Sequence, residues 1–439
     1  MTSRRKLLVV GVAGLGADLV RKHPPAGGPL FRSAESVFPA VTCTVQATMR
    51  TGRPPRDHGM IANGLYLRDL RRVMFWEQSA ALVQGPRLWR NLRAAGGRVG
   101  LLFWQQSLGE EADLLLSPKP VHKHHGGMIQ DCYSRPADLY DRLSRKIGRP
   151  FNLMHYWGPL ASARVNDWIA AATIEVMRSP DLAPDLLFTY LPGLDYDLQR
   201  AGPDSRKSFQ PACPHPLGGG AGRCLEKTYS DLSNLWKNAD AAGYDWLVFG
   251  DYAMEPVTGG PVFPNRALRQ AGLMSVRLVG GRAYHDLFAS AAFAMADHQV
   301  AHVYVNGENV GRARAALETL DGVAEILDRA AQERVGLDHP NSGELVLVAA
   351  KGRWFAYPWW TDPKEAPDFA AHVDIHNKPG YDPCELFFGW PPMTVSQDPS
   401  RVRGTHGRTG PGYEVAWASS LEFAEPPKSL LELAREIVR

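Results

Sequence analysis

The sequence predicts an α/β protein built on a predominantly parallel, doubly wound sheet, with an α+β cap inserted into it. Three observations predict this fold. Continuous apolar runs bounded by Gly, Pro or Asp recur through the first half of the chain, as expected of strands covered on both faces. Amphipathic helical patterns lie between these runs, and the pattern changes from about residue 255 to residue 366. With 439 residues, of which 44% are hydrophobic, the chain can bury a large core.

Four apolar runs are typical of buried parallel strands. The first leads into a turn that contains Gly14 and Gly16. In a doubly wound sheet, functional side chains gather where such strands end, at their carboxyl ends. The four runs are Lys6–Val12, Gly97–Trp104, Leu186–Leu191 and Asp245–Gly250.

Three segments between these runs place apolar side chains on one helical face. The alternation of strand and helix is the reason to expect parallel pairing, because each helix carries the chain back to the start of the next strand. The three helical segments are Pro86–Ala95, Ala161–Met177 and Glu226–Ala242.

The later part of the chain divides into an inserted cap and a return to the core. We expect residues 1–254 and 367–439 to form the core and residues 255–366 to form the cap. A surface loop is expected around the glycines at 218–220. Within the cap the pattern predicts strands over 292–305 and 344–350 and helices over 311–320 and 323–334; after it, 370–388 returns to the core and a helix covers 429–439.

Composition excludes several classes of protein. The formal net charge is +3, from 49 basic and 46 acidic residues, which does not support binding to a nucleic-acid polymer or a membrane surface. No apolar run approaches the roughly 18 residues of a membrane span. The cluster Arg4-Arg5-Lys6 precedes an apolar run too short for a signal peptide. The five cysteines are odd in number and form no CxxC pair, so we expect buried free thiols and a cytoplasmic protein.

The strongest chemical signal lies between residues 36 and 66. Thr42 and Thr44 follow a turn at Pro39 and precede Gln46-Ala47-Thr48, a segment that favours the start of a helix. A hydroxyl at a helix N-terminus lies where main-chain N–H groups and the helix dipole stabilise an anion. It is therefore well placed to attack a phosphoryl group. The alternative is that Thr42 serves as a helix cap.

This segment resembles the nucleotide pyrophosphatase/phosphodiesterase branch of the alkaline phosphatase superfamily. The resemblance rests on Thr51-Gly52, Arg53-Pro54-Pro55 and the run from His58 to Asn63, which match the family pattern in type and spacing. It implies an alkaline-phosphatase-like fold, Thr42 as the nucleophile and Asn63 as the amide that donates to a phosphoryl oxygen.

The resemblance also implies a metal centre, from which this chain departs. Family members bind two divalent ions with three Asp, three His and the nucleophile. The family's later motifs place metal-binding residues at Asp195 and Asp251, with His376 as a substitute for a late His that aligns with Pro379. Other expected ligands are replaced, by Ala13, Gln199 and Tyr252. A carboxylate-rich remnant suits Mg²⁺ or Mn²⁺ better than Zn²⁺, so one divalent ion of any of these kinds, or none, is expected.

The remaining histidines favour structural roles. His122, His124 and His125 form a cluster without a spaced carboxylate, which is a weak metal signal and equally typical of a surface loop. His298 lies in strand-like sequence and is expected to be a satisfied core or cap residue. His406 lies in a basic glycine-rich loop, which would either approach a phosphate or be solvated.

These residues lead to one functional hypothesis and two alternatives. The first is a phosphoric ester hydrolase in which Thr42 attacks phosphorus and Asn63 holds the oxyanion of a small phosphorylated substrate. The second is a pseudo-enzyme that keeps the phosphate-binding cradle and has lost the two-metal centre. The third keeps catalysis with altered chemistry, on a sugar phosphate for example. The sequence does not determine the substrate, the oligomeric state, or the choice between monoester and diester.

Overall fold

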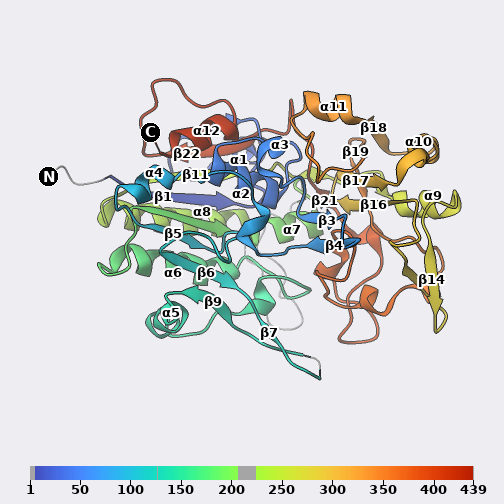
Figure 1. Cartoon of the computed structure of the whole chain (residues 1–439). Helices are drawn as coiled ribbons and strands as arrows, with labels where there is room; N and C mark the ends of the chain where they lie inside the picture. Colours follow the sequence, from blue (N-terminus) through green and yellow to red (C-terminus); the bar gives the residue numbers. More distant parts are fainter. Residues whose placement is uncertain (1–4, 126, 206–223, 439) are drawn as a thin grey trace.

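The structure is a computed structural model that describes residues 5–125, 127–205 and 224–438. Its centre is an eight-stranded sheet in the order β2-β22-β11-β1-β10-β5-β6-β9 (Figure 1). The five strands from β11 to β6 run parallel, and β22, β2 and β9 pair antiparallel at the two sides. The bounds are β1 Lys6–Val12, β2 Arg32–Ala34, β5 Val99–Leu102, β6 Leu114–Pro118, β9 Cys132–Arg135, β10 Leu186–Leu191, β11 Tyr244–Gly250 and β22 Val415–Ser419.

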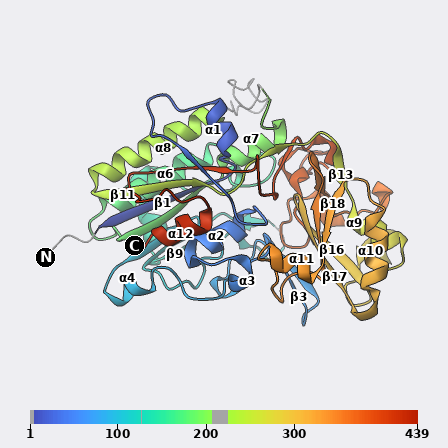
Figure 2. The ribbon, with the colours of Figure 1, turned by 90° about the horizontal axis from the view of Figure 1, so that it is seen from above.

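The sheet is the middle of three layers. Along β1, Leu8 and Val10 point into one hydrophobic cluster and Leu7 and Val9 into another, because side chains alternate across a strand. Helices cover both faces, as the view from above shows (Figure 2). Because hydrophobic clusters cover both faces of the sheet, the four strand runs carry few polar residues.

The helices divide between these faces. On one face lie α1 Ala17–Lys22, α6 Val165–Arg178 and α8 Cys224–Ala241, and α6 packs on α8. On the other lie α2 Thr42–Thr51 and α12 Leu430–Glu436, which pack on each other. The remaining helices of the described core residues are α3 Pro55–His58, α4 Arg90–Ala94, α5 Leu139–Ile147 and α7 Gly193–Ala201.

A second sheet, of four strands in the order β16-β17-β19-β18, lies to one side of the large sheet (Figure 1). All its pairs are antiparallel. Its hydrophobic cluster also takes in Cys43, Ala47 and Ile61, so residues next to Thr42 pack against it. The bounds here are α9 Pro264–Gln270, β14 Val276–Val279, β15 Arg282–His285, β16 Ala292–Asp297, β17 Val300–Val305, α10 Val310–Glu318, β18 Val323–Leu327, α11 Arg329–Arg334 and β19 Leu345–Ala349.

Short strands complete the fold as two-stranded pairs. They are β3 Gly64–Leu67 with β4 Arg72–Phe75, β7 Val121–His122 with β8 Met128–Ile129, β12 Glu255–Pro256 with β21 Gly404–Thr405, and β13 Gly260–Val262 with β20 Arg353–Phe355; β14 pairs with β15. The His122 cluster lies on the exposed β7–β8 hairpin, as expected of a surface loop.

Two predicted helices are wrong in part. Residues 323–334 contain β18 followed by α11, and Asp328 caps α11 by accepting the Ala331 N–H at 2.9 Å. Because β18 is an edge strand whose register shifts between Val323 and Glu325, its sequence lacks the alternation of a half-buried strand. The helix predicted over 86–95 covers just Arg90–Ala94, since the main-chain N–H of Leu88 donates to the Arg50 carbonyl.

Other expectations are confirmed or refined. The strand predicted over 292–305 is the β16–β17 hairpin, which turns at His298 and Gln299, and residues 370–388 form short 3₁₀ turns. The final helix begins after Ser429, whose hydroxyl caps it.

The cysteines of the described residues, Cys43, Cys132, Cys224 and Cys384, are buried and free. Cys213 and the loop at 218–220 lie outside the described residues. Among the described helices, none combines the length and apolarity needed to cross a membrane.

Candidate active site

Thr42 is the first residue of α2, at the side of the sheet where β1, β10 and β11 end. The helix therefore begins at Thr42, four residues earlier than the sequence pattern suggested. Val41 is the capping residue and forms no side-chain cap, so the alternative role of Thr42 as a cap is wrong. With its side chain 5% exposed, Thr42 lies among the first N–H groups of the helix, where an anion is stabilised.

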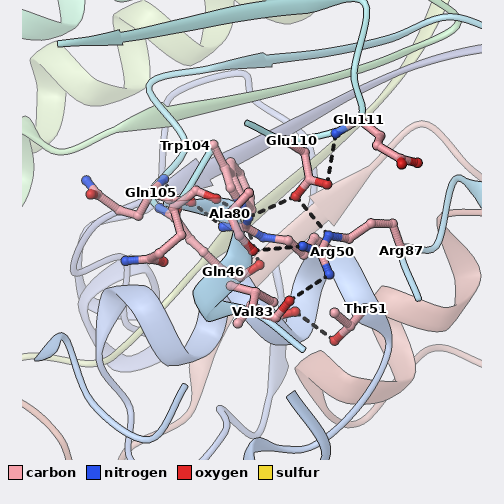
Figure 3. Close-up of polar contacts among 12 residues, drawn as sticks. Gln46, Arg50, Thr51, Ala80, Val83, Arg87, Trp104, Gln105, Glu110 and Glu111 are labelled. Carbon is pink, nitrogen blue, oxygen red and sulfur yellow. Dashed lines mark hydrogen bonds and ion pairs between the residues drawn. The ribbon is translucent and has the colours of Figure 1, made fainter. Parts of the chain in front are cut away.

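Helix α2 is held in place from its other end by a buried ion pair (Figure 3). Arg50 is fully buried and donates to the Gln105 and Gln106 carbonyls, the latter at 2.7 Å. Its guanidinium lies 3.4 Å from Glu110, which also accepts from Arg87 at 2.8 Å. Loss of one partner of such a pair costs about 3–5 kcal/mol, because a charge is left buried alone. This network fixes the position of α2.

Asn63 is tied to the start of α2. Its Oδ1 accepts the main-chain N–H of Cys43 at 3.0 Å, the residue that follows Thr42. Its Nδ2 donates to Asp297 at 3.1 Å, and its main-chain N–H donates to the same carboxyl at 2.7 Å. An amide Nδ2 carries two hydrogens, and Asp297 accepts one of them. The structure thus places Asn63 beside the first turn of α2, which begins at Thr42.

Asp297 is a site residue that the sequence reasoning missed. It is the last residue of β16 and is fully buried, and besides Asn63 it contacts His298 Nδ1 at 2.8 Å. Its signal in the sequence was the interruption of an apolar strand by Asp297-His298-Gln299. A charged residue in a buried strand requires a partner, but the partner lies more than 200 residues away in the chain.

A hydrogen-bonded chain connects Thr42 with Asp251. The Tyr190 hydroxyl donates to Asp251 Oδ2 at 2.8 Å and lies 3.3 Å from Thr42 Oγ1. Either hydroxyl can be the donor in the contact between Thr42 and Tyr190. Asp251 Oδ1 accepts the main-chain N–H groups of Gly14 and Tyr252, at 3.1 and 3.0 Å. Tyr190, at the end of β10, was not predicted.

Asp195 lies in the first turn of α7 and is held by two neutral donors. The Tyr252 hydroxyl donates to its Oδ1 at 2.9 Å, and Gln199 Nε2 donates to its Oδ2. Gln199 is oriented in turn by the Tyr381 hydroxyl, which donates to its Oε1 at 2.9 Å. Tyr252 and Gln199, which stand where the family has imidazole ligands, therefore serve as hydrogen-bond donors.

Burial dominates the electrostatics of the three carboxyl groups. It raises the pKa of Asp251 to about 8 and the pKa values of Asp195 and Asp297 to about 6, although their hydrogen bonds act in the opposite direction. Burial lowers the pKa of His298 to about 3 and holds the pKa of His406 well below its usual range. The imidazoles are consequently neutral, and the proton that Asp251 holds at neutral pH reduces the buried charge.

His406, rather than His376, is the late histidine at this site. The His376 side chain is exposed, and the structure shows no contact between it and Asp195 or Asp251. His406 is buried; its Nδ1 lies 2.8 Å from the Ala40 carbonyl, and its ring packs on Tyr252 and His298. Of the two alternatives for His406, the solvated one is therefore wrong. Burial of a glycine-flanked loop depends on long-range packing, which no local pattern reports.

The side chains present at this site do not fit the two-ion metal centre of the family that the chain resembles. All four carboxyl oxygens of Asp195 and Asp251 accept hydrogen bonds from protein groups. Ala13 has no ligand atom, and the amide of Gln199 and the phenol of Tyr252 donate where a ligand has to supply a lone pair. Within residues 5–125, 127–205 and 224–438, no three His, Cys, Asp or Glu side chains are grouped so as to hold a metal.

The fold and the Thr42–Asn63 pair define an alkaline-phosphatase-like protein. The chain belongs to the type I phosphodiesterase/nucleotide pyrophosphatase family, whose sequence model matches residues 7–382. This confirms the resemblance drawn from the segment that contains Thr42 and Asn63. A search of curated proteins found no match to the chain.

Solved structures share the fold at low sequence identity. Phosphonoacetate hydrolase from Sinorhizobium meliloti 1021, in complex with phosphonoformate, is 17% identical with a TM-score of 0.59, and the match covers 99% of this chain and 95% of that one. Murine ectonucleotide pyrophosphatase/phosphodiesterase 5, an inactive threonine-to-alanine variant in complex with AMP, is 15% identical with a TM-score of 0.54, covering 94% and 87%. The human form is 14% identical with a TM-score of 0.56 and the same coverage.

Proposed function

We propose that this protein is a phosphoric ester hydrolase of small phosphorylated molecules, with Thr42 as its nucleophile. The observation that carries the proposal is the position of the Thr42 hydroxyl, at the first residue of α2 and hydrogen-bonded to Tyr190. Asn63 is joined to the same helical turn through Cys43. Membership of the phosphodiesterase/pyrophosphatase family supports the reaction class.

The reaction has two steps. Thr42 Oγ1 attacks phosphorus, the bond from phosphorus to the leaving-group oxygen breaks, and the proton of the Thr42 hydroxyl passes to that oxygen; water then cleaves the bond between phosphorus and Oγ1, leaving its hydroxyl on phosphorus and its second hydrogen on Oγ1. The free Nδ2 hydrogen of Asn63 and the first N–H groups of α2 stabilise the negative charge that develops on the phosphoryl oxygens. Tyr190 orients the hydroxyl of Thr42 through the hydrogen bond between them. No step passes through a metal ion, since the side chains at the site do not fit one.

The ligands of the structural relatives support a small substrate. The bacterial relative was solved with phosphonoformate and the murine relative with AMP, and the threonine-to-alanine form of the latter is described as inactive. We extend both features to this chain as part of the proposal: a small molecule with a phosphoryl group, and a threonine on which activity depends.

A second candidate function is phosphate binding without hydrolysis. It is favoured by the hydrogen bonds that Tyr252 and Gln199 donate to Asp195, at positions where the family has metal ligands. A threonine without an adjacent ion or base is a weak nucleophile at neutral pH. The cradle formed by α2 and Asn63 would still bind an anion.

The test measures hydrolysis and binding on the same preparations. The substrates are p-nitrophenyl phosphate, bis(p-nitrophenyl) phosphate and the p-nitrophenyl ester of thymidine monophosphate, and the proteins are wild type, T42A and the control T44V. Thr44 lies on the same helix, fully buried. Hydrolysis that is lost in T42A and kept in T44V supports the hydrolase. Binding of AMP without turnover supports the second candidate, and absence of both contradicts the two functions together.

A further inference from the structure

A small cavity beside the candidate active site is lined by two hydrogen-bond donors without acceptors. Its volume is about 40 Å³, against the roughly 10–15 Å³ that one water molecule requires. The cavity lies where α9 and β20 meet the segment around Tyr381. The residues used below are Phe263, Arg266, Trp354, Tyr381 and Asp382, all of which line it.

Arg266, on α9, is the first donor. Its guanidinium lies 3.6 Å from the centre of the Phe263 ring, and its Nε is buried without a hydrogen-bond partner. Among the described residues, it forms no side-chain hydrogen bond and no ion pair. Burial lowers the pKa of Arg266, yet a guanidinium stays charged in proteins at neutral pH. A half-buried charge without a counter-ion is costly, because desolvation is not offset by any partner.

Trp354, on β20, is the second donor. Its side chain is 2% exposed, and its indole Nε1 is buried without a partner. Asp382 is the one acidic residue among those that line the cavity, and Lys378 Nζ lies 2.7 Å from its Oδ2 and 2.7 Å from Glu385 Oε1. Asp382 is thus engaged with Lys378 and forms no ion pair with Arg266. The residues around this space, which is large enough for more than one water molecule, therefore include a guanidinium and an indole N–H without acceptors.

We propose that this cavity is a binding site for a small oxyanion, in which Arg266 supplies the charge and Trp354 a further donor. Planar guanidinium groups bind carboxylate and phosphate oxygens in pairs, and the apolar wall of Phe263 strengthens these bonds by excluding water. The site is distinct from the Thr42–Asn63 pair. It is connected to it through Tyr381, whose ring lines the cavity and whose hydroxyl holds Gln199 beside Asp195.

Calorimetric titration with sodium phosphate at constant ionic strength tests the proposal. The proteins are the full-length wild type and the variants R266Q, W354F and R277Q. The first change removes the charge, and the second removes the indole N–H while keeping an aromatic ring. Arg277 is an exposed arginine of β14, so R277Q controls for net charge. We expect phosphate to bind at least about tenfold more weakly to R266Q, and several-fold more weakly to W354F, because hydrogen bonds to charged groups are lost. R277Q should bind as the wild type does.

The variant N63A separates this site from the candidate active site. Phosphate affinity that falls in R266Q but persists in N63A supports the cavity, whether or not the protein hydrolyses esters. Affinity that is unchanged in R266Q overturns the proposal, and if it falls in N63A instead, the anion occupies the Thr42 site. Crystals soaked in phosphate provide the second readout: density against Arg266 is expected in the wild type, and its absence there contradicts the proposal.

Discussion

The imidazole ring of His406 lies flat on the phenol ring of Tyr252, with ring centroids 3.4 Å apart and planes that differ by 2°. This stack holds Tyr252 in the orientation in which its hydroxyl donates to Asp195. The ring of His298 packs on His406 and on Tyr381, with ring centroids 3.7 Å and 3.8 Å apart. Aromatic rings and phenol hydroxyls thus surround the carboxyl group of Asp195.

Replacement of Thr42 by alanine should lower ester hydrolysis by at least about 10³-fold, because the nucleophile is removed. T42S should keep part of the activity, since it keeps a hydroxyl at the same helical position. Initial rates with bis(p-nitrophenyl) phosphate measure both effects. Equal rates for T42A and wild type would show that another group attacks phosphorus.

Tyr190 should act as a positioning residue for Thr42. Y190F removes the bonds to Thr42 and Asp251, so we expect a fall in kcat of about 10–100-fold with little change in KM. Unfolding free energy should fall by about 1–3 kcal/mol, because Asp251 Oδ2 loses its donor. The control is Y244F, which removes another buried phenol hydroxyl, one that donates to the Pro184 carbonyl. If both variants keep full kcat, Tyr190 is merely structural.

Asn63 and Asp297 should act as one unit. N63A removes an oxyanion donor and should lower kcat by about 10²–10³-fold. D297N should lower it less, because the amide remains but loses its orientation. In the double variant the effects should not add, since Asp297 acts through Asn63. Additive losses, measured as changes in kcat/KM, would mean that Asp297 has a separate role.

Activity should not depend on a divalent ion. Treatment with a chelator should leave the rate unchanged, and elemental analysis of untagged protein should find no stoichiometric metal. The triple variant A13D/Q199H/Y252H restores a carboxylate and two imidazoles and should gain zinc affinity. Loss of wild-type activity on chelation, with recovery on adding one ion, would instead assign Asp195 and Asp251 as its ligands.

Stability should fall as pH rises towards 8. The pKa of Asp251 is about 8 in the folded protein, above the value near 3.9 of an unfolded chain. The folded state therefore holds more protons between these pH values, and unfolding free energy decreases across this window. At 1.36 kcal/mol per pH unit the decrease reaches at most about 6 kcal/mol.

Thermal melting of wild type and D251N between pH 5 and pH 9 checks this prediction. The fall in Tm over that interval should be smaller in D251N, whereas the exposed D240N should follow the wild type. A wild-type Tm that increases with pH would mean that Asp251 is ionised and paired with a cation.

The sequence by itself determined the layers of the core and the segment that contains the candidate residues Thr42 and Asn63. The runs at Lys6–Val12 and Leu186–Leu191 match β1 and β10 in both bounds, because a strand buried on both faces must be apolar throughout. The resemblance of one segment to the family also led to Asn63, which the structure places beside the first turn of α2. The apolar periodicity of the sequence did not predict β18, because this edge strand has no continuous buried face.

Only the tertiary structure decided which groups meet Thr42 and the two aspartates. Asp297 and His406 reach the site from 255 and 364 positions beyond Thr42, as their residue numbers give. Tyr252 and Gln199 could be recognised in the sequence as missing ligands, but not as donors to Asp195. The physical reason is that a local pattern records which side chains are buried, whereas the partner of a buried polar group is set by the packing of segments far apart in the chain.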